Sequence, residues 1–162
     1  MKLITRSLVV SVACLGLIAL LISPVSAQID SQVGIWKLNV AKSKYSPGPA
    51  PKSATTTIEA AGAGTKVSVD QMRADGTMTQ WGFSADYDGK DNPMTGNNPD
   101  ADMIARTRVD ANTIQSISKK DGKVTTTQLS KVSADGKTRT VTTKGMNAAG
   151  KKVDNVAVYD KQ

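Results

Sequence analysis

The sequence predicts an all-β protein: an antiparallel up-and-down meander of about ten strands closed into a barrel, preceded by a cleaved signal peptide. After an N-terminal apolar run, no segment repeats apolar residues with the spacing of an amphipathic helix over three or more turns. Thr, Val, Ile and Ser instead dominate short alternating runs, which favour strands. Tight glycine turns separate these runs and join adjacent antiparallel strands. A meander of this length avoids exposed edges most simply by closing into a barrel.

The chain begins with a secretory signal pattern at residues 1–27, which leaves one domain at residues 28–162. Basic Lys2 and Arg6 precede an apolar run, and the small residues Val25-Ser26-Ala27 form a cleavage site. We therefore expect cleavage after Ala27 and an exported protein, periplasmic or extracellular.

Two other interpretations of this segment are less favoured. A retained membrane anchor is disfavoured because the apolar run at residues 8–22 is shorter than the roughly 20 residues that span a bilayer. A lipoprotein at Cys14 is disfavoured because the large aliphatic residue usual three positions earlier is missing. No stable membrane insertion is expected after cleavage.

The first four strands are expected at residues 34–40, 53–60, 65–73 and 78–87. In each, side chains of one kind recur at every second position, as on one face of a strand. The recurring residues are Trp36, Leu38 and Val40; Thr55 and Thr57; Val67 and Val69; and Trp81, Phe83, Ala85 and Tyr87.

The other six strands are expected at residues 90–96, 102–110, 113–119, 123–133, 138–146 and 152–160. Turns such as Asp88-Gly89, Asp121-Gly122 and Asp135-Gly136 supply the positive-φ residues between them. Two longer connections interrupt the meander. Residues 42–52, with three prolines, are expected to form a loop near one mouth of the barrel, and residues 97–100 form the second irregular stretch.

The composition excludes much enzyme chemistry. The chain has no histidine, and its one cysteine, Cys14, lies in the signal segment. Zinc or copper sites and His-dependent nucleophiles therefore lack their usual groups. Glu59 is the only glutamate, so carboxylate pairs are few. We expect no enzyme and no cofactor.

Charge adds a further exclusion. Without Lys2 and Arg6, 19 basic residues face 14 acidic ones, a net charge of +5. The densest basic group, residues 119–123, is typical of a solvated hairpin tip, because a nucleic-acid site needs clustered cations and stacking aromatics. No nucleic-acid partner is expected.

Aspartates around residues 86–91 raise the question of calcium. Asp86, Asp88 and Asp91, with Asp100 and Asp102 further on, could supply oxygen ligands. The spacing is not that of an EF-hand, and Asp-Gly is also an ordinary hairpin turn. Turn chemistry is the favoured interpretation, and no metal site is predicted.

Six residues are candidates for ligand binding. Trp81, Phe83 and Tyr87 form the main aromatic stripe, which could be a ligand wall or ordinary core packing. Arg106 and Arg108 project from one face of a strand and could receive an anion, although solvent-facing side chains are the simpler alternative. Tyr159 is a further polar anchor.

The segment Val33-Gly34-Ile35-Trp36-Lys37-Leu38 resembles the opening of the lipocalin and fatty-acid-binding protein (calycin) superfamily, and residues 156–161 look like the closing strand of the fatty-acid-binding branch. The chain also resembles lipocalin-like exported bacterial proteins of unassigned function. This resemblance implies a barrel that holds a ligand inside.

The chain departs from that pattern in three places. Residues 42–52 replace a two-helix lid. Ala157 stands where the resemblance implies an arginine two residues before Tyr159. No arginine follows Arg139 to pack over Trp36.

The favoured hypothesis is an exported, non-catalytic protein that binds a small, partly apolar or amphipathic molecule inside the barrel. The alternative is a ligand-free structural or protein-interaction module of the cell envelope. A transmembrane barrel is a poor third, because six aromatics cannot build two girdles. The sequence predicts no oligomeric state.

Overall fold

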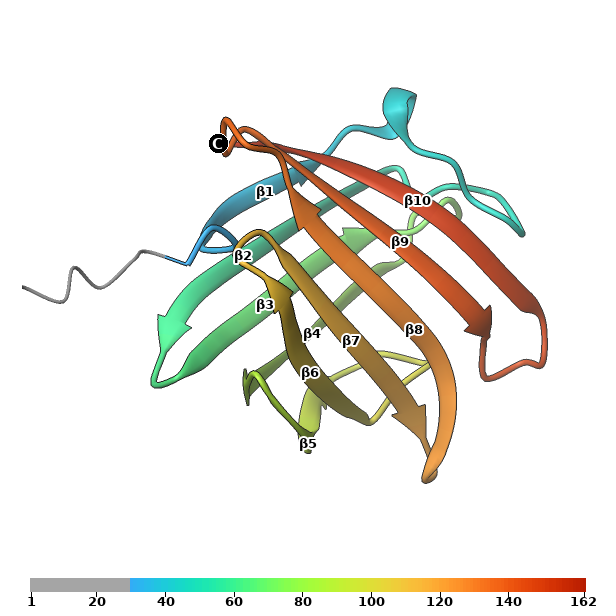
Figure 1. The fold of residues 1–162 in the computed structure, drawn as a ribbon. Coiled ribbons are helices and arrows are strands. Elements are labelled where there is room, and N and C mark those ends of the chain that lie inside the picture. The colour runs from blue at the N-terminus through green and yellow to red at the C-terminus, as the bar shows by residue number, and fades with distance from the viewer. Residues whose placement is uncertain (1–29) are drawn as a thin grey trace, which may run out of the picture.

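The computed structural model describes residues 30–162, so the predicted signal peptide and cleavage site lie outside the described residues. This part of the chain forms ten strands and one short 3-10 helix at Val40–Lys42 (Figure 1). The strands are β1 (Gly34–Leu38), β2 (Ser53–Ala61), β3 (Gly64–Met72), β4 (Met78–Asp86), β5 (Asp88–Gly96), β6 (Met103–Asp110), β7 (Thr113–Lys120), β8 (Lys123–Val132), β9 (Thr138–Met146) and β10 (Lys152–Lys161).

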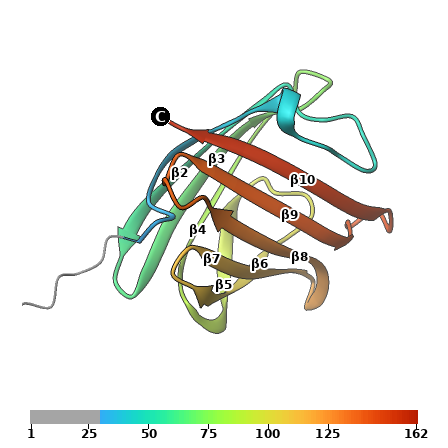
Figure 2. The same cartoon turned by 45° about the horizontal axis from the view of Figure 1, so that its top comes forward.

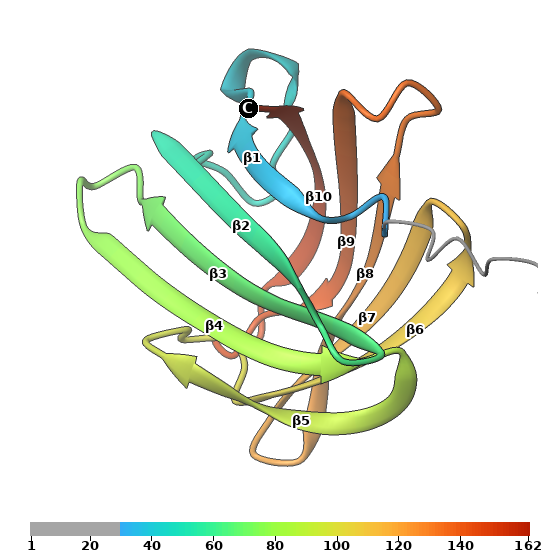
Figure 3. The ribbon, with the colours of Figure 1, turned by 90° about the vertical axis from the view of Figure 1, so that its left-hand side faces the viewer.

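The strands form a closed antiparallel barrel, which confirms the predicted fold class. Each strand pairs with the next along the chain, and β1 pairs with both β2 and β10 to close the ring. Figures 1 and 3 show the strands wrapping around a common interior, with β3 and β4 across the barrel from β8 and β9. Within residues 30–162, no helix is long and apolar enough to cross a membrane.

The strand bounds agree with the predicted ones to within two residues, with one informative difference. The first strand ends at Leu38, because the Asn39 side chain accepts a hydrogen bond from the Lys42 amide and caps the 3-10 helix. Asn39 also donates to Asp160 at 2.7 Å. Val40, predicted to be in the strand, therefore lies in the helical turn and is exposed.

The proline-rich connection at residues 42–52 is a loop, as predicted, and it runs beside β10 (Figure 2). Lys44 forms a β-bridge with Val156, and the Ser46 carbonyl accepts from the Asp154 amide. These bonds hold the loop against the barrel, and they place Tyr45 and Pro47 beside the interior.

One end of the barrel, which we call the closed end, contains the main core. Trp36 has no exposed surface and packs with Ile58, Val67 and Val132. Its indole N–H donates to the Gln32 carbonyl at 2.8 Å. The Lys161 ammonium lies 5.2 Å from the Trp36 ring centre, so a lysine supplies the cation over this tryptophan that no later arginine could provide.

Candidate functional site

Residues 30–33 lie across the closed end, and we call them the N-terminal plug. The plug contacts the β6–β7 turn, where the Gln32 side chain donates to the Asn112 carbonyl at 2.9 Å. It also contacts the β4–β5 connection, where the Asp30 carboxylate accepts from the Tyr87 hydroxyl at 2.6 Å. Gln32 is fully buried. The plug therefore ties β1 to the far side of the barrel.

Inside the barrel, a cavity of about 360 Å³ extends from the closed end toward the other end. Inward-facing side chains of eight strands, β2–β4 and β6–β10, line it together with β5 residue Met94. The other end is lined by loop residues, among them Tyr45, Pro47, Pro99 and Asn147. We call this loop-lined end the mouth. The barrel is therefore not filled by its own side chains.

Two opposite sides of the cavity differ in chemistry. On the side formed by β3–β5, Val67, Val69, Trp81, Phe83 and Met94 form the apolar wall, and Gln71 and Arg73 line the cavity at and just beyond the mouth end of β3. The side formed by β7 and β8 is the polar wall: Ser116, Ser118, Thr126 and Gln128. Both walls follow from the alternation of side chains along a strand, which sends every second residue into the barrel.

Arg106 projects from β6 into the cavity with only 2% of its surface exposed. One terminal nitrogen donates to the Thr65 hydroxyl at 2.5 Å, while its buried Nε has no hydrogen-bond partner among the described residues. The guanidinium also lies 5.5 Å from the Phe83 ring centre. Burial lowers the pKa of Arg106, although a nearby phenol and carboxylate raise it.

Arg139 projects from β9 into the same cavity and is also buried. Its Nε donates to the Ser130 hydroxyl at 2.8 Å and to the Gln32 side-chain oxygen at 3.3 Å. Its guanidinium lies 5.6 Å from the Tyr159 ring centre. Burial lowers the pKa of Arg139 to about 10, so the group is still charged at neutral pH.

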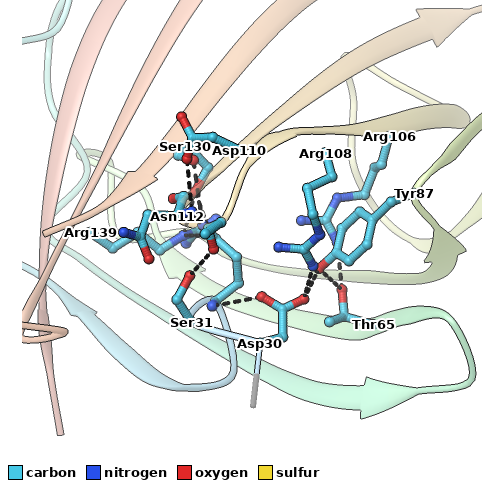
Figure 4. A network of polar contacts seen from close by, with 12 residues as sticks. Asp30, Ser31, Thr65, Tyr87, Arg106, Arg108, Asp110, Asn112, Ser130 and Arg139 are labelled. Carbon is cyan, nitrogen blue, oxygen red and sulfur yellow. Dashed lines mark hydrogen bonds and ion pairs between the residues drawn. The ribbon is translucent and has the colours of Figure 1, made fainter. Parts of the chain in front are cut away.

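The Asp30 carboxylate, which accepts from Tyr87, also pairs with a third arginine, Arg108. Arg108 donates to the Asp30 carboxylate at 2.5 Å and lies 4.2 Å from the Tyr87 ring centre. Figure 4 shows Arg108 and Tyr87 side by side above Asp30. Burial opposes ionisation of Asp30, but hydrogen bonds from Tyr87, the Gln32 amide and Arg108 outweigh it and lower the pKa of Asp30. Arg108 is thus ion-paired. In the described part of the chain, neither Arg106 nor Arg139 forms a salt bridge with a carboxylate.

The structure divides the six predicted ligand-binding residues. The cavity lining includes Trp81, Phe83, Arg106 and Tyr159, whereas Tyr87 and Arg108 belong to the Asp30 network at the closed end. The alternative that both β6 arginines face solvent is wrong for Arg106. Arg106 and Arg108 do project from one face, as predicted, since both guanidiniums contact the Tyr87 ring.

Sequence reasoning missed Arg139 and Gln32. Ala157 does leave the β10 position empty of an arginine, but β9 supplies a guanidinium because Arg139 is the register partner of Tyr159. Counting outward from the glycine turn at residues 147–151 would have found this pair. Gln32 had no comparable signal, since residues 30–33 carry no strand alternation.

Three of the five aspartates considered for calcium are engaged elsewhere. Asp88 accepts from the Lys90 amide in a turn, Asp91 pairs with Lys119 at 2.6 Å, and Asp102 lies 3.7 Å from Lys120. Within residues 30–162 no group of three or more His, Cys, Asp or Glu side chains is arranged to hold a metal ion.

No protein-family model matches the chain, and no curated protein sequence matches it. Among solved structures, the chain is similar to zebrafish ileal bile acid-binding protein complexed with cholic acid. The sequence identity is 14% and the TM-score is 0.49, and the match covers 82% of this chain and 99% of the zebrafish chain. A likeness of this degree carries no conclusion about what this barrel binds.

Proposed function

We propose that this protein is a non-catalytic binding protein that holds a small amphipathic anion inside its barrel. One observation carries the proposal: two buried guanidiniums, of Arg106 and Arg139, line the cavity without a carboxylate partner among the described residues. A buried charge is costly unless it is paired, and an anionic ligand would supply the missing partner.

The polar groups around these arginines suit a carboxylate, sulfate or phosphate. Arg106 has an unused Nε donor, and Tyr159 lines the same cavity with its ring centre 5.6 Å from the Arg139 guanidinium. Guanidinium groups bind such oxyanions through charge-assisted hydrogen bonds. The apolar wall would then cover the rest of the ligand, since pockets of this kind combine apolar surface with a few directed polar groups.

The cavity also favours this function over the ligand-free module, because a structural barrel has no need of an open, charged interior.

We further propose that the protein works outside the cytoplasm, in the periplasm or beyond the cell. The signal pattern at residues 1–27 supports this location.

The test compares decanoate, decyl sulfate and neutral decanol, which share one alkyl chain. Trp81 lines the cavity, so an entering ligand should change tryptophan emission, and Trp81→Phe should remove that change. We expect saturable micromolar binding of the two anions and at least tenfold weaker binding of decanol.

Arg106→Gln and Arg139→Gln should each weaken anion binding about tenfold or more, whereas Lys66→Gln, which removes an exposed cation outside the barrel, should not. Equal binding of decanol and decanoate, or no effect of either arginine variant, would overturn the proposal. Native mass spectrometry of protein from its own host would identify a co-purifying ligand.

A further inference from the structure

The polar wall presents hydrogen-bonding groups along the cavity rather than at one point. Ser116 and Ser118 lie on β7, and Thr126 and Gln128 lie on β8, at alternate positions that all face inward. Ser130, the next inward residue of β8, is already bonded to Gln32 and Arg139. For the other four side chains the structure records no protein hydrogen-bond partner within residues 30–162.

The apolar wall faces them from across the barrel, where Trp81 and Phe83 lie on β4, and Val67 and Val69 lie on β3. Figure 3 shows β3 and β4 on one side of the interior and β7 and β8 on the other. A ligand that runs from the buried arginines toward the mouth therefore meets apolar surface along one side, as far as Gln71 and Arg73, and hydrogen-bonding groups along the other.

We infer that the ligand is an anionic amphiphile that carries hydroxyl or other oxygen groups along one side of its apolar body. This inference rests on the proposed function and names its ligand class. A plain alkyl chain would remove water from the polar wall and leave those groups without partners, which is unfavourable. A ligand with oxygen groups facing β7 and β8 would satisfy them and still bury its other side against Trp81 and Phe83.

The experiment uses a matched ligand pair, stearate and 9,10-dihydroxystearate, which differ by two hydroxyls on the same chain. Affinities are measured by titration calorimetry below the micellar concentration of each. An apolar pocket prefers stearate, because hydroxyls lose hydration on entry. We expect the opposite order here, with the dihydroxy acid bound about tenfold more tightly.

The variants Thr126→Val and Gln128→Met remove hydrogen-bonding groups from the polar wall while keeping side-chain size close. Each should reduce the preference for the dihydroxy acid at least threefold, because the dihydroxy acid loses a hydrogen-bond partner while stearate no longer leaves that polar group without one. Thr127→Val is the control, since Thr127 is exposed on the outer face of the same strand.

The outcomes separate the inference from the proposed function. If stearate binds as tightly as the dihydroxy acid, or if the polar-wall variants leave the preference unchanged, the inference is overturned while the anion-binding function stands. If neither acid binds, the proposed function itself fails.

Discussion

The arginines of β6 and β9 differ in what each contacts, and these contacts decide the charge of the interior. Arg108 pairs with Asp30 at the closed end, whereas Arg106 and Arg139 meet only hydroxyl, amide and aromatic groups among the described residues. Asp30 thus neutralises one cation and leaves two buried guanidiniums within the cavity, while the half-buried Arg73 lines it as well. A carboxylate placed next to Arg106 or Arg139 would neutralise that guanidinium and weaken anion binding.

Gln32→Glu tests this charge balance directly. The Gln32 side-chain oxygen already accepts from Arg139 at 3.3 Å, so a carboxylate there would pair with that guanidinium. We expect decanoate binding to weaken about tenfold or more in titrations at neutral pH. Gln115→Glu adds the same charge on an exposed position of β7 and should leave binding within twofold. Equal affinities of the two variants would contradict the assignment.

Asp30→Asn tests the pH dependence of the plug. Because the folded-state pKa of Asp30 is lowered, its ionisation stabilises the fold above the ordinary value of 3.8, and this contribution is lost as pH falls through the folded pKa. We expect Asp30→Asn to cost about 1–2 kcal/mol at pH 7 and less below pH 3, measured by urea unfolding. A constant difference between wild type and variant across this pH range would contradict the expectation.

Trp36→Ala removes the largest fully buried side chain of the closed end. Large aromatic deletions in a packed core cost about 3–5 kcal/mol, and this variant also loses the indole bond to Gln32 and the ring beneath Lys161. The free energy of unfolding in urea gives the measurement. Wild-type stability in this variant would mean that the Gly-x-Trp pattern has no structural role here.

At the scale of elements, the sequence predicts the strands well because turn-forming residues, above all glycines, lie at many strand ends. Glycine turns separate β2 from β3, β3 from β4, β7 from β8, β8 from β9 and β9 from β10, so the strand bounds at these turns follow from local residues alone. The end of β1 is instead set by the Asn39 cap and its bond to Asp160, which is 121 positions away. Local alternation cannot show a contact of that kind.

The candidate site was predictable only in part, for a related reason. Alternation along one strand places Trp81 and Phe83 on a common face, and it does the same for Arg106 and Arg108. Which of two arginines on one face reaches the cavity depends on depth along the barrel and on the plug. That information lies in strand register and in contacts with residues 30–33, not in the pattern of one strand.

Gly145→Ala probes how closely β8 and β9 approach near the mouth. Gly145 has a φ of +145°, and a Cβ there would lie 2.2 Å from the Thr125 carbonyl oxygen. The strands must separate to admit it, so we expect a loss of about 2–4 kcal/mol in urea unfolding. Gly150→Ala, with a φ of +72° and open space around it, should cost about 1–2 kcal/mol. Equal costs would mean that β8 and β9 separate freely here.

At the scale of the whole molecule, the two ends of the barrel have different construction. The closed end is sealed by the aromatic core and by a plug from the beginning of the described chain, whereas loops line the mouth. The two buried cavity arginines, Arg106 and Arg139, lie near the plug, whereas Arg73, the proline loop and the β5–β6 connection border the mouth. A ligand that enters between the loops would therefore place its anionic end deepest.

This arrangement gives the predicted export a structural consequence. Cleavage after Ala27 would start the mature chain at Gln28, two residues before Asp30, and would leave the whole plug in place. Intact mass spectrometry of the secreted protein should show this N-terminus, and a soluble form that retains Met1 would contradict export.

A chain that begins at Val33 would lack Asp30 and Gln32, so Arg108 and Arg139 would lose their partners. We therefore expect the free energy of unfolding of the truncated chain, measured in urea, to be about 2–4 kcal/mol lower than that of the Gln28 form. Equal stability of the two forms would mean that residues 30–32 do not seal the barrel.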